Sequence, residues 1–586
     1  MKYIAIKSLV VSSSLLTLSC SRSESVSETK EAVDGNSSLE LLGDIGSPTV
    51  SDITAVASVA SPTIPWTDTY WPLTEKSLAR RWKPSEQAIG IAEYFTSQTA
   101  QDKVQKVDPY LSPADKYDIL YRWRHNVKID EAKVTALTTD WQIAEDGLDM
   151  SAIPGSRGLV NDVLNQFNSA ESAEFRRQFP MSANGWNDWL YYTSNDRFQF
   201  MDDESSGENW GWMGACHGWA AAALLAETPK HAVLAKFEDK EVLLTEGDIR
   251  GLLTKSWADH APSDSQYFIG RRCEQNSADP EGEIPHDENG HAYYGQIIRG
   301  EEKTGFFVKS EMYASFKRSN DRIYPVSYGA DADVQGFLLE TYQGRRRYAY
   351  VLAKSMADLR SYIVDQDRSK VEVLPGVEMF GCWDVNPATF HMALLQKIGK
   401  EQVGLVMDRT RTGQVWNQPV YAADFTFGER IPFKKGLFSR THAPNTKYIL
   451  PIEAKVKWIS EPAVQSFAYT AEYDKRHTVE TRYTYFLEFD RDDKLLGGGW
   501  GTLEGGDSNL VTPDFIYGFD KGSKPVDDFR NGFDYSGIVE QIHNCSLSDK
   551  AEGKTTLETS EYNSAGRLVV RKQSIHFSDC VLTKAQ

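Results

Sequence analysis

The residue most suited to chemistry is Cys216, which lies in a segment crowded with small and aromatic residues, 209–219. The alanine-rich run 220–226 follows it and Pro229 closes that run, so we predict a helix that begins at Cys216. The start of a helix presents free backbone N–H groups and a positive dipole end, which stabilise a thiolate and a developing oxyanion. The sequence therefore predicts a cysteine nucleophile, and the alternative is a small buried cysteine beneath an alanine helix.

A cysteine nucleophile needs a base, and His391 is our candidate. It lies in a run that we interpret as a strand, and a second strand-like run ends at Asp408. A turn at Gly399 and Lys400 would place His391 opposite Asp408 on adjacent antiparallel strands, where the carboxylate could orient the imidazole. The alternative for His391 is a buried strand histidine.

His217 is adjacent to the nucleophile in sequence, but it points about 100° around the predicted helix from Cys216. We interpret it as a packing or cleft-lining neighbour.

Three stretches resemble the transglutaminase elicitor family of oomycetes and marine bacteria. They are residues 212–222 around the cysteine, Asp408-Arg409-Thr410, and the string Val-Trp-Asn-Gln-Pro-Val at 415–420. After Val420 the chain departs from the surface peptide of the oomycete members, so elicitor activity is not carried over.

The resemblance implies a papain-like core and calcium-dependent transglutaminase activity, with Cys216, His391 and Asp408 as the catalytic residues. Cys216 would attack a protein-bound glutamine to give a thioester with release of ammonia, and a lysine amine would then form an isopeptide bond. Attack by water instead would deamidate the glutamine. Calcium is implied by the family alone, because the carboxylate clusters at 490–493 and 202–204 lack EF-hand spacing, and no metal ligands are assigned.

Further site residues are expected near the cysteine, although core packing is an equal alternative for each tryptophan. The candidates are Asn209 and Trp210 as oxyanion donors, Trp212, Trp219, Trp416 and Asn417 as the walls of the substrate cleft, and Trp210 also as part of a tunnel that excludes water.

These residues need a scaffold, and the sequence predicts an α+β protein in several parts. We expect a mainly helical accessory or pro-domain at 66–186, able to shield the cleft, a papain-like catalytic domain at 187–441, and a β-rich domain at 442–586. Within the helical region, Ser112, Pro113 and Asp115 form a predicted helix start. In the β-rich region we expect a strand over 482–489 and a turn at Gly497-Gly498-Gly499.

Residues 1–20 resemble a bacterial lipoprotein signal that ends at Cys20, which we expect to be lipidated, and 21–65 reads as a flexible tether. We therefore expect export to the bacterial outer membrane or cell surface, or secretion. An ordinary cleaved signal peptide is the alternative.

Export predicts an oxidising compartment, in which four of the six cysteines can form disulfides. The local pairing joins Cys273 to Cys382 and Cys545 to Cys580, although three pairings are possible and four free thiols are the alternative.

The formal charge of -19 excludes a typical nucleic-acid binder, so the expected partners are proteins bearing Gln and Lys. The predicted function is that of a protein-glutamine gamma-glutamyltransferase. A papain-like cysteine peptidase or amidase would use the same triad, and a noncatalytic surface binding lipoprotein is the alternative of another class. The sequence does not determine the oligomeric state.

Overall fold

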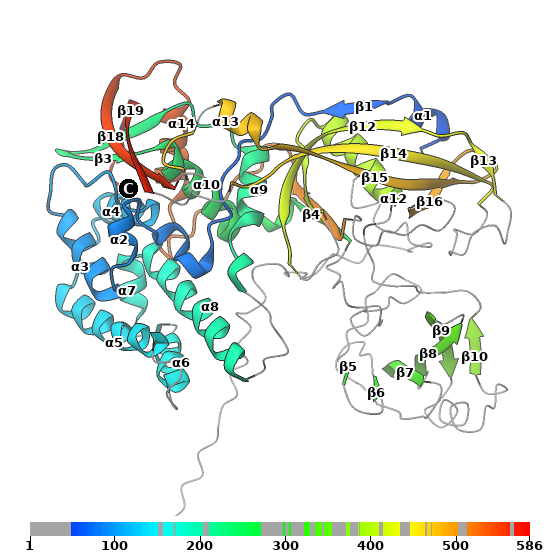
Figure 1. The fold of residues 1–586 in the computed structure, drawn as a ribbon, viewed down its shortest axis with the longest axis horizontal. Helices are drawn as coiled ribbons and strands as arrows, with labels where there is room; N and C mark the ends of the chain where they lie inside the picture. Colours follow the sequence, from blue (N-terminus) through cyan, green and yellow to red (C-terminus); the bar gives the residue numbers. More distant parts are fainter. Residues whose placement is uncertain are drawn as a thin grey trace, which may run out of the picture.

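The computed structural model describes residues 48–149, 156–202, 210–270 and 385–585 with short gaps, together with six strands between 297 and 374. Helices gather on one side and a long sheet extends from the other, with strands on both sides of the central helices (Figure 1). The predicted α+β class is confirmed, as is a β-rich C-terminal part.

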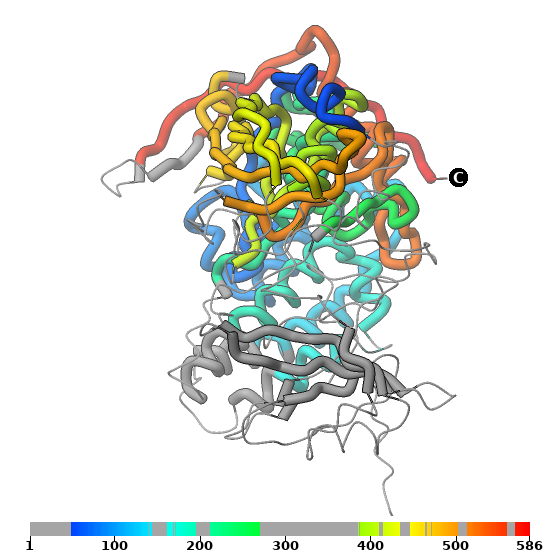
Figure 2. Tube along the Cα trace, turned by 90° about the vertical axis from the view of Figure 1, so that its right-hand side faces the viewer, coloured from blue at the N-terminus to red at the C-terminus, as the bar shows by residue number. Residues whose placement is uncertain are grey.

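The N-terminal region is helical, as predicted. Ser112 caps α4 through a capping box with Asp115, and Pro113 opens that helix, because these three residue types satisfy the first free N–H groups. Figure 2 shows these helices, in blue and cyan, below the yellow and orange strands. The region contains η2 (Leu73–Glu75), η3 (Ser77–Ala79), α2 (Pro84–Gln87), α3 (Ile91–Gln101), α4 (Pro113–His125), α5 (Glu131–Asp149), α6 (Ser156–Phe167), α7 (Ala173–Gln178) and α8 (Ser182–Asp202).

Two central helices join the helical part to the sheets. The short helix η4 (Trp210–Trp212) leads into α9 (Cys216–Leu225), which packs against α10 (Glu246–His260). The contact is close, because a Cβ on Gly218 would collide with the carbonyl oxygen of Thr254. Their buried side chains belong to the same hydrophobic core as those of the N-terminal helices.

The largest sheet contains strands from both the predicted catalytic domain, 187–441, and the predicted β-rich domain, 442–586. Its strand order is β16-β15-β14-β12-β11-β17-β4. These strands are β4 (Gln266–Gly270), β11 (Leu405–Asp408), β12 (Asn417–Phe427), β14 (Tyr448–Ile459), β15 (Thr478–Phe489), β16 (Leu495–Trp500) and β17 (Phe515–Phe519), with β13 (Ile431–Pro432) paired to β14. The predicted boundary at 441 is therefore wrong, because backbone hydrogen bonds between β12 and β14 cross it.

The predicted strand over 482–489 is confirmed within β15, but the predicted glycine turn is wrong. Gly498 and Gly499 lie inside β16, paired with β15. A Cβ on either glycine would collide with Phe486, so close packing against that residue explains the glycines.

A second sheet has the order β18-β19-β2-β3 and also joins distant parts of the chain. Its strands are β2 (Ala232–Phe237), β3 (Lys240–Leu244), β18 (Gly553–Tyr562) and β19 (Leu568–Val581), and β19 runs parallel to β2. The helices η9 (Tyr535–Val539) and α14 (Glu540–Ser546) lead into it. The predicted disulfide between Cys545 and Cys580 is confirmed and ties α14 to β19.

Smaller elements complete the described structure. They are η5 (Ser263–Ser265), α13 (Ala471–Arg476), a two-stranded sheet of β5 (Ile297–Ile298) and β6 (Thr304–Gly305), and a four-stranded sheet of β7 (Arg322–Tyr328), β8 (Val334–Tyr342), β9 (Arg345–Ala353) and β10 (Val371–Leu374). Cys273, Cys382 and Cys20 lie outside the described residues.

The predicted tether over 21–65 is wrong for its last part. Helix α1 (Val50–Thr54) begins at a capping box between Thr49 and Asp52, and β1 (Ser58–Ala60) pairs with β12. Ile53 and Val59 are buried in the core beneath the large sheet, which explains why a serine-rich segment is ordered. No helix in the described part of the chain is long and apolar enough to cross a membrane.

Docking of this segment can be tested with Ile53→Ala. Ile53 is fully buried, so we expect the free energy of unfolding to fall by about 2 to 4 kcal/mol. Urea unfolding of the variant and of Ser58→Ala, a change at an exposed position of β1, would measure the difference. A loss below about 0.5 kcal/mol for Ile53→Ala would mean that the segment is a tether after all.

Candidate functional site

Cys216 begins α9, as the sequence predicts. Its side chain is only 5% exposed. The amide Nδ2 of Asn417 donates a hydrogen bond to the sulfur over 3.4 Å, and the thiol lies 3.9 Å from the carbonyl oxygen of Val415. Asn417 is the first residue of β12 and Val415 lies just before it, so the thiol lies between the first turn of α9 and the start of this strand.

The thiol of Cys216 is protonated at neutral pH, which contradicts the expected thiolate. Burial raises its pKa to about 11, the hydrogen bonds from Asn417 oppose this rise, and the charges of Glu461 and Asp408 add to it. The free-energy cost of removing a thiolate from water is therefore larger here than the stabilisation that the helix start and the amide donor provide.

Asp408 lies near the cysteine, but it is paired with Asn417 and not with His391, which the sequence analysis placed opposite it. It ends β11 and is paired in register with Asn417 of β12. Its Oδ1 accepts a hydrogen bond of 3.4 Å from the backbone N–H of Trp416. The β11–β12 pairing thus brings Asp408 and Asn417 together at the thiol.

His391 does not join this group, so the predicted triad is not assembled. It lies in helix α12 (Pro387–Ala393), and its Nδ1 is 2.7 Å from the hydroxyl of Tyr485. Its ring centroid is 4.6 Å from that of Phe425, which is eight residues along β12 from Asn417. Extended strand covers about 3.3 Å per residue, so Phe425 lies about 25 Å along β12 from Asn417, and the His391 ring is therefore at the other end of the strand from the thiol.

The predicted strand around His391 is wrong, because the apolar residues there repeat with the period of a helix. Phe390, Leu394 and Ile398 are fully buried at a spacing of four, which is helical rather than alternating. Helix α12 continues as the π-helix η8 (Leu394–Lys400) through Gly399, and the chain turns only at Gln402 and Gly404, which have positive φ. Burial lowers the pKa of His391 to about 3, so the ring is a poor base in its aromatic surroundings.

His217 is half-buried, and burial also lowers its pKa. Its carbonyl oxygen accepts a hydrogen bond from the hydroxyl of Tyr517. Within the described parts of the chain, no histidine is hydrogen-bonded to the Cys216 thiol.

The predicted cleft walls have different positions. Trp219 is fully buried and donates its indole N–H to the carbonyl oxygen of Trp66 over 3.2 Å, so it is a core residue. Trp416 is half-buried beside the site, and Trp212 is half-buried against the core. Asn209 and the side chain of Trp210 lie outside the described residues.

The family model described as transglutaminase elicitor matches residues 380–546. The resemblance to that family is confirmed. The matched segment contains Asp408 and Asn417 but not Cys216, and it supports a transglutaminase-type function.

The crystal structure of the GP42 transglutaminase from Phytophthora sojae is similar to this chain at 15% sequence identity, with a TM-score of 0.42. The alignment covers 88% of this chain and 99% of that one. No curated protein matches the chain.

A segment that the sequence did not single out lies beside Cys216. This N-terminal strap, residues 66–71, runs along α9. The carbonyl oxygen of Tyr70 accepts a hydrogen bond of 2.7 Å from the backbone N–H of Ala215, and the Tyr70 ring contacts Trp416 edge-on with centroids 5.3 Å apart. Only the aromatic density of the strap could have signalled this role.

The strap is anchored by buried polar groups. Asp68 accepts hydrogen bonds from the hydroxyl of Tyr469 over 2.5 Å and from the indole of Trp71 over 2.9 Å. Arg250 forms an ion pair with Asp474 and also bonds to the carbonyl oxygen of Thr67. The predicted accessory or pro-domain is therefore not a separate body, because its first residues are bonded into the core around α9.

The described residues do not fit a calcium site. They contain no group of three or more His, Cys, Asp or Glu residues that could hold a metal. In the predicted cluster at 490–493, Asp490 accepts backbone N–H groups of its own turn and Asp493 pairs with Arg430. Of the cluster at 202–204, only the backbone of Asp202 is described, as the end of α8.

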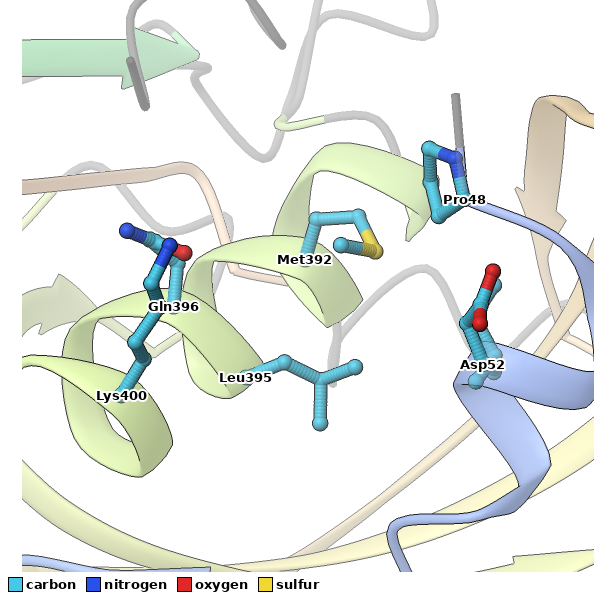
Figure 3. A pocket seen from close by; sticks show the side chains of 7 residues that line it. Pro48, Asp52, Met392, Leu395, Gln396 and Lys400 are labelled. Carbon is cyan, nitrogen blue, oxygen red and sulfur yellow. The ribbon is translucent and has the colours of Figure 1, made fainter. Parts of the chain in front are cut away.

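A hollow of about 450 Å³ lies elsewhere, between α1 and the helix that continues from α12 (Figure 3). Pro48 and Asp52 face Met392, Leu395 and Lys400 across it. Its lining holds neither a cysteine nor a histidine, so it offers no second cysteine–histidine pair.

The hydrogen bond from Asn417 can be tested with Asn417→Leu. Loss of the side-chain donor should raise the pKa of Cys216 further, because only the backbone hydrogen bond from residue 417 then opposes the effect of burial. The midpoint of the pH dependence of iodoacetamide alkylation, followed at the Cys216 peptide by mass spectrometry, should move to higher pH. Thr426→Val, at an exposed position near the far end of β12, is the control, and equal midpoints in both variants would exclude this role for Asn417.

Asp68 should make the stability of the strap depend on pH. Burial raises its pKa to about 6, above the ordinary value near 3.9, so the folded state holds this proton more tightly than the unfolded state. Its contribution to stability is complete below pH 4 and is lost as the pH rises through 6.

In Asp68→Asn this pH dependence should decrease by about 2 kcal/mol between pH 4.5 and 7. Urea unfolding at the two pH values measures it, with exposed Asp492→Asn as the control. If the free energy of unfolding changes between the two pH values by the same amount in the parent and in Asp68→Asn, then Asp68 does not titrate in this window.

Proposed function

We propose that this protein is a protein-glutamine gamma-glutamyltransferase that crosslinks Gln to Lys through a Cys216 thioester. The observation that supports this most directly is the contact between Cys216 and Asn417. A cysteine at the start of a helix is bonded there to a side chain from the segment that matches the transglutaminase elicitor family. The expected substrates are proteins that bear Gln and Lys, and the net charge of -19 disfavours nucleic acid.

In the first half-reaction, the sulfur of Cys216 attacks the carboxamide carbon of the glutamine. The C–N bond breaks, the thiol proton leaves with the nitrogen as ammonia, and a thioester remains. The backbone N–H groups of Cys216 and His217 open α9 and are the natural donors to the oxyanion. Asp408, whose charge already acts on the thiol, is the group that we assign to the proton transfer.

In the second half-reaction, a lysine amine attacks the thioester carbonyl carbon. The new C–N bond replaces the C–S bond, and the sulfur recovers a proton from the amine. Water in place of the amine yields glutamate. The buried position of Cys216, beneath Tyr70 and Trp416, supports amine transfer, because exclusion of water biases the thioester towards the amine.

Three further expectations remain part of this proposal. They are lipidation at Cys20, export to the bacterial outer membrane, the cell surface or the medium, and stimulation by calcium. No step above is routed through calcium, because the described residues do not fit a calcium site.

The test is incorporation of a labelled primary amine into a glutamine-rich protein, with and without calcium, by the parent chain and by Cys216→Ala. We expect incorporation and ammonia release in the parent and loss of at least 100-fold in the variant, since the thioester cannot form. Circular dichroism of both proteins would confirm equal folding. Equal activity in the two proteins would reject the proposal.

A noncatalytic binding role is the second candidate, because the thiol is buried with a raised pKa and no described histidine contacts it. Absence of both amine incorporation and Cys216-dependent substrate cleavage would favour this role. Cleavage without incorporation would instead identify a cysteine peptidase or amidase.

A further inference from the structure

A second hollow lies where the N-terminal helices meet the sheet of β2 and β3. Its volume is about 350 Å³, a size in which proteins bind small molecules. Four segments that are far apart in the chain line it: the end of α3, the stretch from the end of α4 to the start of α5, the turn between β2 and β3, and Lys584. The C-terminal residues are held beside α4 (Figure 1), because the backbone N–H of Ala585 donates a 3.0 Å hydrogen bond to the carbonyl oxygen of Arg124.

The lining of this hollow is positive. Five Lys or Arg side chains and three Asp or Glu side chains border it, which leaves two positive charges on a protein whose net charge is -19. All three carboxylates are already in ion pairs with N–O distances of 2.6 to 2.8 Å. The pairs are Arg122–Asp102, Lys103–Glu131 and Lys584–Glu238. Lys128 and Lys240 are the two cations that remain.

Lys240 is held at the hollow without a carboxylate. Its Nζ donates a hydrogen bond of 2.9 Å to the carbonyl oxygen of Asp102 and lies 4.7 Å from the ring centroid of Trp123. An ammonium group has three N–H donors, so two of them stay available to a ligand. Lys128 is exposed, and neither lysine forms an ion pair with another described residue.

Trp123 supplies a further donor that the protein does not use. Its side chain is 9% exposed, lines the hollow and stacks on Phe237, with ring centroids 6.4 Å apart. The indole N–H is buried and has no hydrogen-bond partner in the part of the chain that the structure describes. A ligand oxygen is the kind of acceptor that this donor lacks.

The types of cation favour a phosphate group. Lysine ammonium groups are compact charges that bind phosphate oxygens without the planar match that arginine offers to a carboxylate. The arginine of the hollow is not available for such a match, because Arg122 is buried and bonds to both oxygens of Asp102 and to the carbonyl oxygen of Gln178. The charge available to a ligand is therefore that of the two lysines.

We propose that this hollow binds a small anion that carries a phosphate group, with Lys128 and Lys240 meeting its charge and Trp123 as a further donor. A bound anion would contact the helical region and the turn between β2 and β3 together, so it would stabilise the folded chain. The proposal does not rest on the proposed function, since the residues that line the hollow are not those around Cys216.

The experiment is calorimetric titration of inorganic phosphate, glycerol 3-phosphate and succinate into the full chain. We expect the dissociation constants of the two phosphates to rise about tenfold in Lys128→Gln/Lys240→Gln, because the two unpaired charges are lost. Lys128→Arg/Lys240→Arg, which keeps both charges, should retain most of the affinity. The matched control is Lys106→Gln/Lys133→Gln, which removes two equal charges from exposed positions outside the hollow and should change binding less than about twofold.

The ligand arms separate the possible sources of the phosphate. Tighter binding of glycerol 3-phosphate than of inorganic phosphate would identify an organic phosphate, and equal constants would identify the free ion. Succinate has a similar charge without a phosphate group, so binding of succinate as tight as that of both phosphates would overturn the proposal.

Hydrogen exchange followed by mass spectrometry gives the position of the ligand. Glycerol 3-phosphate should slow exchange in residues 99–103, 122–131 and 237–240 of the parent, and not in β15. Protection only outside the hollow, an equal loss of affinity in the lysine variant and in its control, or no binding of either phosphate to the parent would overturn the proposal. Circular dichroism of every variant would confirm equal folding.

Discussion

The antiparallel pairing of β11 with β12 determines what surrounds the thiol of Cys216. It sets Asp408 opposite Asn417 at the point where both strands meet the first turn of α9. A shift of one residue in this register would turn Asn417 away from the sulfur and bring Gln418 towards it, because strand side chains alternate between faces. The remaining strands of the sheet support this pair, with β17 on the outer side of β11 and β14 beyond β12.

The electrostatics of the site differ from those of a resting thiolate. The loss of water and the charges of two carboxylates oppose ionisation of Cys216, and the side-chain and backbone hydrogen bonds from Asn417 favour it. A site of this kind keeps the sulfur protonated and unreactive until a ligand changes its surroundings. In the proposed reaction that ligand is the glutamine substrate, whose departing nitrogen takes the proton.

The sequence predicted what depends on local signals. The start of α9 followed from an alanine-rich run, the start of α4 from its capping box, and the Cys545–Cys580 disulfide from proximity in the chain. The sequence analysis was wrong, or silent, about features that depend on contacts between segments far apart in the chain. His391 lies in a helix whose apolar residues also suited a strand, and the strap reaches the start of α9 only through contacts between distant segments. The boundary at 441 failed for the same reason, since β12 and β14 join in space across it.

The contact between α9 and α10 determines how a substrate can reach the thiol. At Gly218 the two helices meet backbone to backbone, so α9 has no side chain there over which it could slide, and any shift of α9 would carry α10 with it. The thiol is therefore carried by a helix that is tightly packed on one side. In the proposed reaction, Tyr70 and Trp416, which meet edge-on, are the side chains that would have to rotate to admit a bulky protein substrate.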